Sequence, residues 1–248
     1  MTSPTPRTVM ISGASRGIGH AVAARLLKAG HRLSLGVRHP EGLAPWLGDL
    51  QTGTDPTERL LICPYDARSE RAASSSAESW VDATVSRWGG VDAVVHSAGL
   101  LSRVGVCFSN EEESEIQQLM DVNLMAPWRL SRAAWPHLAA SGDGRIITLV
   151  SMSGKRIKGR LAAYGVSKFA LMGLCQAMRH EGWASGIRVT AICPGWVNTS
   201  MAAAVEEIPR QAMTQPEDLA ETVQHLLGLP ASAVPFEYAV NCLLESSL

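Results

Sequence analysis

Short apolar runs alternate with stretches of helical spacing along this chain, and this alternation constrains the fold more than any other feature. The apolar runs predict strands at Thr8 to Ser12, Arg32 to Val37, Leu60 to Cys63, Asp92 to His96, Arg145 to Val150, Ile187 to Ile192 and Glu237 to Leu244. Helical spacing covers His20 to Ala29, Ser74 to Trp88, Glu112 to Leu138, Leu161 to Trp183 and Pro216 to Leu227. Strands that alternate with helices imply crossover connections and a parallel sheet covered on both faces. We therefore predict an α/β fold with a doubly wound parallel sheet of about seven strands.

The longest helical segment has two interpretations, whereas the domain organisation has one. The segment from Glu112 to Leu138 reads either as one long helix or as two consecutive helices that meet at Pro127. No linker-like stretch divides the chain, so we predict a single domain over residues 1–248.

Charge and hydropathy exclude two classes of partner. The formal net charge is −1, which provides no basic field for nucleic acid. No apolar run approaches the roughly 20 residues that cross a bilayer, and Met1 to Arg7 lacks the pattern of a signal peptide. We therefore expect neither nucleic acid nor a membrane as a partner.

The cysteines indicate a compartment rather than a site. All 5 are widely spaced, and none forms a close pair or a cluster with histidine. This spacing suggests neither a zinc site nor a disulfide framework, so we predict no metal and free thiols. Free thiols are typical of the reducing cytosol, and a cytoplasmic location is expected.

A glycine-rich turn follows the first predicted strand directly. Glycines at 13, 17 and 19 allow the backbone to turn tightly and to approach a phosphate closely. The helix that follows offers free N–H groups and the positive end of its dipole to a pyrophosphate. An ordinary tight turn is the alternative, but the position between a strand and a helix favours dinucleotide binding.

Tyr164 and Lys168 stand four residues apart on a predicted helix, which places them on one face. An ammonium at that position is expected to lower the pKa of the phenol from about 10 toward the working pH. A tyrosine tuned in this way can act as a general acid or base. Such pairs are common on ordinary helices, so the interpretation depends on the glycine turn, Asn123 and Ser151 in the same chain.

Together these motifs resemble the short-chain dehydrogenase/reductase family, in its small single-domain branch with a Rossmann-type fold. The Gly-x-x-x-Gly-x-Gly turn, the Tyr-x-x-x-Lys pair, a serine about a dozen residues before the tyrosine, and Pro-Gly after the sixth strand occur in order from about Thr8 to Leu244. The resemblance implies four catalytic residues: Asn123, Ser151, Tyr164 and Lys168. It implies that the cofactor is held by Gly13, Ser15, Arg16, Gly17, Ile18, Gly19, Arg38, Asp66, Ala98, Gly99, Tyr164, Lys168, Pro194, Gly195, Val197 and Thr199.

The resemblance also assigns roles. Ser151 has the family spacing to Tyr164, whereas its competitor Ser153 is expected in a loop near the substrate mouth. Asn123 is expected to disrupt its helix locally and to hold a water that relays protons to Lys168; an ordinary helical asparagine bonded to a carbonyl is the alternative.

The chain departs from the family pattern at two places. His96-Ser97-Ala98-Gly99 replaces the frequent Asn-Asn-Ala-Gly, so the hydrogen bonds that brace the central sheet must differ. Asn241 to Leu244 replaces the usual pair of glycines near the C-terminus, which affects the C-terminal contacts and not the chemistry.

The charges after the second strand indicate the cofactor. No carboxylate that could bond a ribose 2′-hydroxyl occurs there before Glu41, whereas Arg38 and Arg16 could clamp a 2′-phosphate. Two solvated surface arginines are the alternative. We predict that NADP(H) is preferred, with NAD(H) as the second choice, and that Asp66 contacts the adenine as in the family.

The resemblance implies an NADP(H)-dependent oxidoreductase acting on a small carbonyl or alcohol substrate, as a carbonyl or 3-oxoacyl reductase. The alternatives are an alcohol dehydrogenase working in the oxidative direction and a non-catalytic NADP-binding regulator. The segment from Ser200 to Gln215 is expected to form a substrate lid. The basic stretch from Lys155 to Arg160 reads as a solvated loop, or else as a contact for an anionic substrate or an acidic carrier protein.

The family assembles as dimers or tetramers, so we expect a homotetramer or homodimer. The helices that flank the fifth strand carry apolar side chains on more than one face, and we expect them to pair. These side chains are Leu124, Trp128, Leu130, Trp135, Phe169, Leu171, Met172, Leu174 and Met178.

Overall fold

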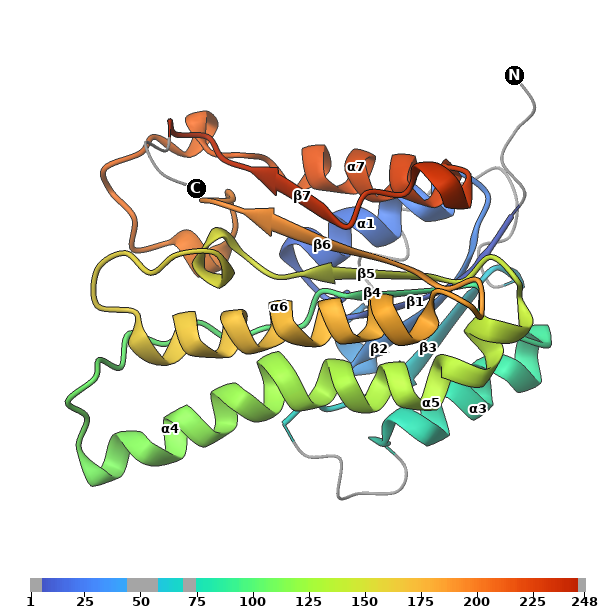
Figure 1. Cartoon of the computed structure of the whole chain (residues 1–248), viewed down its shortest axis with the longest axis horizontal. Helices are drawn as coiled ribbons and strands as arrows, with labels where there is room; N and C mark the ends of the chain where they lie inside the picture. Colours follow the sequence, from blue (N-terminus) through green and yellow to red (C-terminus); the bar gives the residue numbers. More distant parts are fainter. Residues whose placement is uncertain (1–5, 44–57, 69–74, 245–248) are drawn as a thin grey trace.

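The computed structural model describes residues 6–43, 58–68 and 75–244. A 7-stranded parallel sheet runs through it in the order β3-β2-β1-β4-β5-β6-β7 (Figure 1). The strands are β1 (Thr8–Ser12), β2 (Arg32–Val37), β3 (Leu60–Pro64), β4 (Ala93–His96), β5 (Arg145–Leu149), β6 (Arg188–Pro194) and β7 (Glu237–Val240). The chain winds outward in both directions from β1 and β4, which confirms the predicted doubly wound sheet.

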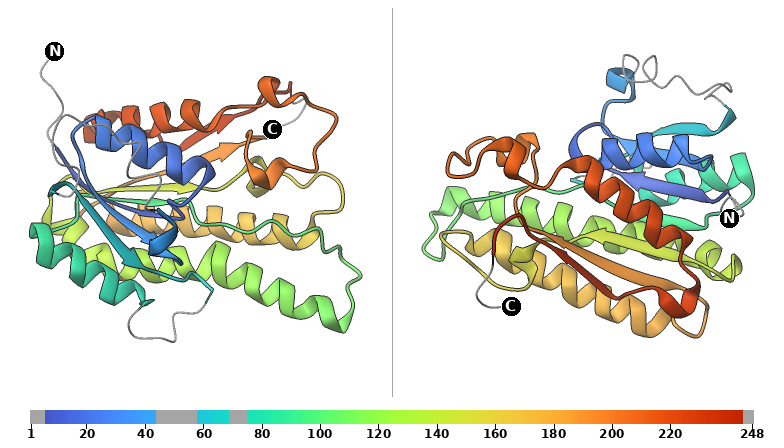
Figure 2. Two further views of the ribbon diagram at one scale, coloured as in Figure 1. Left: turned by 180° about the vertical axis from the view of Figure 1, so that it is seen from behind. Right: turned by 90° about the horizontal axis from the view of Figure 1, so that it is seen from above.

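Helices cover both faces of the sheet (Figures 1 and 2). On one face lie α1 (Gly17–Lys28) and α7 (Pro216–Gly228). On the other lie α3 (Ala77–Trp88), α4 (Asn110–Met120), α5 (Ala126–Ala140) and α6 (Ala162–Gly182). Because both faces are covered, β1 and β4 are buried along their whole length, as their mainly apolar runs predict. Within the described ranges, no helix is both long and apolar enough to cross a membrane.

The segment predicted as one or two helices contains a break of a particular kind. A π-helical turn, η4 (Asp121–Met125), joins α4 to α5. Pro127 lies in the first turn of α5, where proline is common because its fixed φ suits a helix. The joint therefore lies just before Pro127. Single π-helical turns of this kind often occur at functional sites.

The ends of most elements differ from the prediction by a few residues, and two of these differences have a visible cause. The last strand ends at Val240 instead of Leu244, because its neighbour β6 ends at Pro194 and offers no further pairing partner. Helix α3 is first described at Ala77, where the Ser76 side chain caps it; Ser74, its predicted start, lies outside the described residues.

Candidate active site

Two adjoining cavities lie at the carboxyl ends of the strands, toward which the arrowheads of β5, β6 and β7 point in Figure 1. The large cavity, of about 510 Å³, is lined by the β1–α1 turn and by the ends of β2 and β3. The small cavity, of about 250 Å³, is lined by the loops after β5 and β6. Ile18, Gly99 and Thr199 line both, so the two form one continuous site.

The β1–α1 turn has a shape and a charge that suit an anion. A Cβ on Gly13 would lie 2.7 Å from the backbone of Ala98, and its φ of 71° also favours glycine. Arg16 is the N-cap of α1 and makes no side-chain cap hydrogen bond, and the first turn of α1 contains no acidic residue. The first amides of α1 therefore face the cavity without a competing carboxylate, which suits a pyrophosphate.

Arg16 and Arg38 both line the large cavity, as the sequence predicts for residues that hold a 2′-phosphate. Glu41 is the first carboxylate after β2, and its Oε1 lies 3.4 Å from His39 Nδ1. Glu41 does not line the large cavity. The two arginines suit a phosphate better than a ribose hydroxyl.

Asp66 lines the large cavity, but its carboxylate is already engaged by Arg68. The Arg68 guanidinium donates to both oxygens, through Nε at 3.1 Å and Nη2 at 2.8 Å, and the Arg68 backbone N–H adds a third bond at 3.0 Å. These bonds lower the pKa of Asp66. Arg68 was not predicted as a site residue, although an arginine two residues after an aspartate that follows a strand is a visible signal.

The turn after β4 is braced by hydroxyl groups, as the departure from the family pattern requires. Ser12 Oγ accepts hydrogen bonds from the backbone N–H groups of Ser97 and Ala98, at 3.2 and 3.3 Å. His96 is fully buried with Nε2 2.8 Å from Ser131 Oγ. Burial lowers the pKa of His96 to about 3, so the ring is neutral and has a structural role.

Asn123 lies in the π-helical turn and is completely buried. Its Oδ1 accepts from the Leu100 N–H at 2.8 Å, and its Nδ2 donates to the Leu100 carbonyl at 2.9 Å and to Ser167 Oγ at 3.0 Å. A Cβ built on Gly99 would lie 3.5 Å from Asn123 Oδ1 and 3.8 Å from Lys168 Nζ. The predicted helix disruption is therefore present, and Asn123 lies on the same side of the Gly99 backbone as Lys168.

Tyr164 lies in the first turn of α6, is 8% exposed and lines the small cavity. Its side chain is hydrogen-bonded to that of Ser151. Burial raises the pKa of Tyr164, and the Ser151 hydrogen bond opposes this only in part. The prediction that this pKa is lowered is therefore wrong for this structure. Removing the phenolate from water destabilises it more than the Ser151 hydrogen bond stabilises it.

Ser151 follows β5 directly and holds an unusual backbone conformation. Its φ is 147° and its ψ is 157°, a region that side-chain-bearing residues rarely adopt. Its Oγ accepts a hydrogen bond from the Ser153 N–H at 3.0 Å. Ser153 also lines the small cavity, but Ser151 is the serine that bonds Tyr164.

Lys168 is buried one turn along α6 from Tyr164. Its Nζ donates to the Leu149 carbonyl at 3.0 Å and lies 5.8 Å from the centre of the Tyr164 ring. Burial lowers the pKa of Lys168 to about 8, so the ammonium form still predominates at pH 7. The pair on one helix face is thus brought together as predicted.

The remaining predicted residues separate into two groups. Pro194, Gly195, Val197 and Thr199 line the small cavity. Gly19 lines neither cavity; a Cβ there would lie 2.4 Å from the Gly13 carbonyl, so it shapes the turn instead. The parts of the chain that the structure describes contain no cluster of three or more histidine, cysteine or acidic side chains able to hold a metal.

Comparisons with known proteins agree with this geometry. The sequence profile described as short chain dehydrogenase matches residues 7–209. The agropine synthesis reductase of Rhizobium rhizogenes is 33% identical over 241 residues, which cover 96% of this chain and 53% of that protein. The ketoacyl reductase HetN of Nostoc sp. is 29% identical over 198 residues, covering 80% of this chain and 66% of that protein. The chain thus spans about half the length of the first of these relatives.

A solved structure gives the same result. The alcohol dehydrogenase of the archaeon Thermococcus sibiricus, in complex with 5-hydroxy-NADP, superimposes with a TM-score of 0.79 at 28% identity, covering 94% of this chain and 95% of that one. Because the family profile matches residues 7–209, well over half of the chain, this chain belongs to the short-chain dehydrogenase/reductase family of oxidoreductases.

Proposed function

We propose that this protein is an NADP(H)-dependent reductase of carbonyl compounds. The observation that carries the proposal is the pair of hydrogen-bonded hydroxyl groups, Ser151 and Tyr164, in a cavity that continues into the dinucleotide cleft. The free amides of α1 would hold the pyrophosphate, and Arg16 and Arg38 would hold the 2′-phosphate. The solved relative bound to 5-hydroxy-NADP supports the choice of cofactor.

The reductive direction is supported by the protonation states of the site. A bound nicotinamide supplies the hydride. The raised pKa of Tyr164 keeps its phenol protonated, which is the form that can donate a proton to a carbonyl oxygen. Ser151 Oγ donates a hydrogen bond to the same oxygen and stabilises its developing charge. The Lys168 ammonium then compensates the phenolate that remains, and Asn123 holds the Leu100 backbone beside it.

Substituting Tyr164 tests this proposal. Tyr164→Phe removes only the proton donor, so turnover should fall by at least about 10²–10⁴-fold while NADPH binding is retained. Tyr238→Phe is the matched control, because Tyr238 lies on the edge strand β7 and does not line the small cavity. NADPH oxidation with a panel of ketones and aldehydes gives the rate, and fluorescence titration gives the affinity. Near-normal turnover of Tyr164→Phe would contradict the proposed mechanism.

The alternative direction, alcohol oxidation, is tested by the same protein with NADP⁺ and a panel of alcohols. The solved relative's name supports keeping it as the second candidate. A higher kcat/KM for alcohols at neutral pH would favour it over the reductive assignment.

We also propose a homo-oligomer that forms through α5 and α6, which lie side by side on one face of the sheet (Figures 1 and 2). Trp128 on α5 is 51% exposed and Phe169 on α6 is 43% exposed. Leu130 and Leu171, on the same two helices, are buried within the subunit. Large exposed apolar side chains on neighbouring helices favour a two-fold interface.

A cytosolic location completes the proposal. The five cysteines are free thiols, and Cys107 is exposed. A reducing compartment keeps such thiols unpaired.

A further inference from the structure

Two basic side chains line the small cavity beside the catalytic hydroxyl groups. Arg156 and Lys158 belong to the loop between β5 and α6, and both contribute to the cavity wall together with Ser151 and Tyr164. Lys168 is the third cation of this wall. None of the described residues that line the small cavity is acidic.

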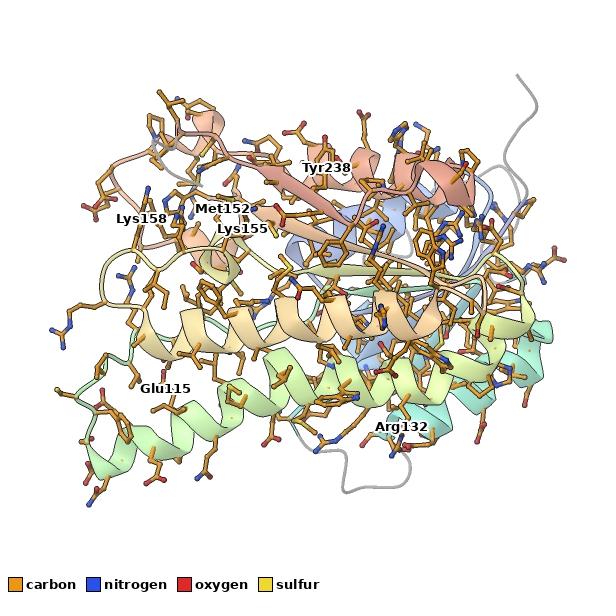
Figure 3. The ribbon with its side chains drawn as sticks, in the orientation of Figure 1. Glu115, Arg132, Met152, Lys155, Lys158 and Tyr238 are labelled. Atoms are coloured by element: carbon orange, nitrogen blue, oxygen red, sulfur yellow. The ribbon has the colours of Figure 1, made fainter. Side chains whose placement is uncertain are left out.

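The basic stretch from Lys155 to Arg160 is divided by the fold and does not form one surface patch. Lys155 is ion-paired with Glu237 on β7. The Arg160 guanidinium lies over Gly105, 3.6 Å from the position of a Cβ there. Only Arg156 and Lys158 face the small cavity, and Figure 3 shows Lys158 directed from its loop toward the segment between β6 and α7. A docking surface for an acidic carrier protein would need all four cations exposed on one face, whereas Lys155 and Arg156 are partly buried and only Lys158 and Arg160 are exposed.

The two cations are also placed away from the cofactor phosphates. Neither Arg156 nor Lys158 lines the large cavity, where the α1 amides, Arg16 and Arg38 are gathered. Their charge therefore acts on whatever occupies the small cavity beyond Ser151 and Tyr164.

Apolar side chains make up much of the rest of the wall. They are Leu161, Trp196, Val197, Met152, Met201 and Leu243. A ligand complementary to this cavity has a carbonyl that contacts Ser151 and Tyr164, an apolar middle part, and an anionic end that contacts the basic side chains. A guanidinium binds a carboxylate through two parallel hydrogen bonds, and half-burial of Arg156 strengthens such a pair.

We propose that the substrate is a small oxo acid, whose carboxylate is bound by Arg156 and Lys158 while its carbonyl meets Ser151 and Tyr164. This inference rests on the proposed reductase function and adds the substrate class. The reaction is the same hydride and proton transfer to the carbonyl, and the carboxylate is unchanged by it.

Matched acids and esters test the anion preference. With NADPH in excess, 4-oxopentanoate, 5-oxohexanoate and 6-oxoheptanoate are each compared with their methyl esters. We expect the kcat/KM of at least one acid to exceed that of its ester by about tenfold or more, since hydrogen bonds to a charged group contribute on that scale. Equal rates for acids and esters would overturn the oxo acid proposal and leave the reductase function standing.

Substitutions then assign the preference to residues. Arg156→Gln and Lys158→Gln should each lower the acid-to-ester ratio about threefold, and the double variant should bring it close to one. Arg160→Gln is the matched control from the same loop, and it should keep the ratio of the unmodified chain. A ratio that Arg160→Gln lowers as much as Arg156→Gln would refute the assignment.

Binding keeps the proposal testable without turnover. Calorimetry on the protein saturated with NADP⁺ compares hexanoate with hexanamide, in which an uncharged amide of similar size replaces the carboxylate. Tighter binding of hexanoate than of hexanamide, lost in Arg156→Gln, would support the anion site. This holds even if none of the carbonyl compounds reacts, because a lack of turnover would count against the reductase function alone. Equal binding of the two compounds, or a preference for 3-oxoacyl thioesters of a carrier protein over the free acids, would overturn the proposal.

Discussion

Replacing Ser151 by glycine and by alanine should separate its chemical role from the strain in its backbone. Ser151 is the one non-glycine residue with a positive φ, 147°, in the described part of the chain. A side chain in this region costs about 1–3 kcal/mol. Both substitutions remove the Oγ that bonds Tyr164, but only glycine releases the strain.

The strain that glycine releases at position 151 exceeds the entropy that it adds to the unfolded chain. Releasing about 2 kcal/mol of strain is offset by about 0.4–1 kcal/mol, because glycine gives the unfolded chain more freedom. Ser151→Gly should therefore be about 1 kcal/mol more stable than Ser151→Ala, which corresponds to about 2–4 °C in Tm for a chain of this size. Both variants should lose about 10²–10³-fold in kcat, as other proteins do when one donor to a developing oxyanion is removed.

Ser153 provides a control with the opposite sign. It lies in the 3-10 turn Met152–Gly154 and has no positive φ, so Ser153→Ala should be more stable than Ser153→Gly by about 0.4–1 kcal/mol. Urea unfolding of all four variants gives the free energies, and NADPH oxidation gives the rates. If Ser151→Ala proved more stable than Ser151→Gly, the strained backbone conformation would be refuted. If Ser151→Gly kept full activity, the proposed role of the Ser151 Oγ in catalysis would be refuted.

Three further predictions concern the cofactor, pH and assembly. Arg38→Ala should weaken NADPH binding by about 1.5–3 kcal/mol and NADH binding far less. Fluorescence titration with both cofactors measures this, and an unchanged preference for NADPH over NADH would show that Arg38 is a solvated residue. Because burial lowers the pKa of His96 to about 3, below pH 6.5 the unfolded chain binds a proton that the folded chain does not. Between pH 7 and 5 the protein should thus lose about 2 kcal/mol more stability than His96→Asn, as urea unfolding at both pH values can show; equal losses would refute the burial argument. Light scattering should give a mass of at least twice the 26.5 kDa of one chain, and the double variant Trp128→Asp/Phe169→Asp should reduce it to that of a monomer. A monomeric unmodified protein would contradict the proposed interface.

The fold was predictable because its signals are local. Strands buried on both faces are mainly apolar, so β1, β2 and β5 could be located nearly to the residue. The glycine turn was equally readable, because Gly13 has no room for a Cβ beside Ala98. The π-helical turn at Asp121–Met125 was predicted only as a disruption, since its form depends on the bonds that Asn123 makes to Leu100 across the chain.

The properties that sequence could not provide depend on tertiary surroundings. The spacing of Tyr164 and Lys168 says that they share a helix face, but not that both are buried, and burial decides the direction of both pKa shifts. In the same way, a basic stretch does not show which of its side chains face a cavity. Lys155 turns to Glu237, and Arg156 lines the small cavity, although they are neighbours in sequence.

The two pKa shifts together lead to a last prediction, on the pH dependence of reduction. When Tyr164 gives up its proton it becomes a buried phenolate, which needs the Lys168 ammonium nearby. Lys168 loses its charge with a pKa of about 8, so kcat should fall above about pH 8 although the phenol itself stays protonated there. In Lys168→Arg the charge persists at every accessible pH, so the rate will be lower overall but the decline near pH 8 should disappear. A decline that persists in this variant would show that a group other than Lys168 controls it.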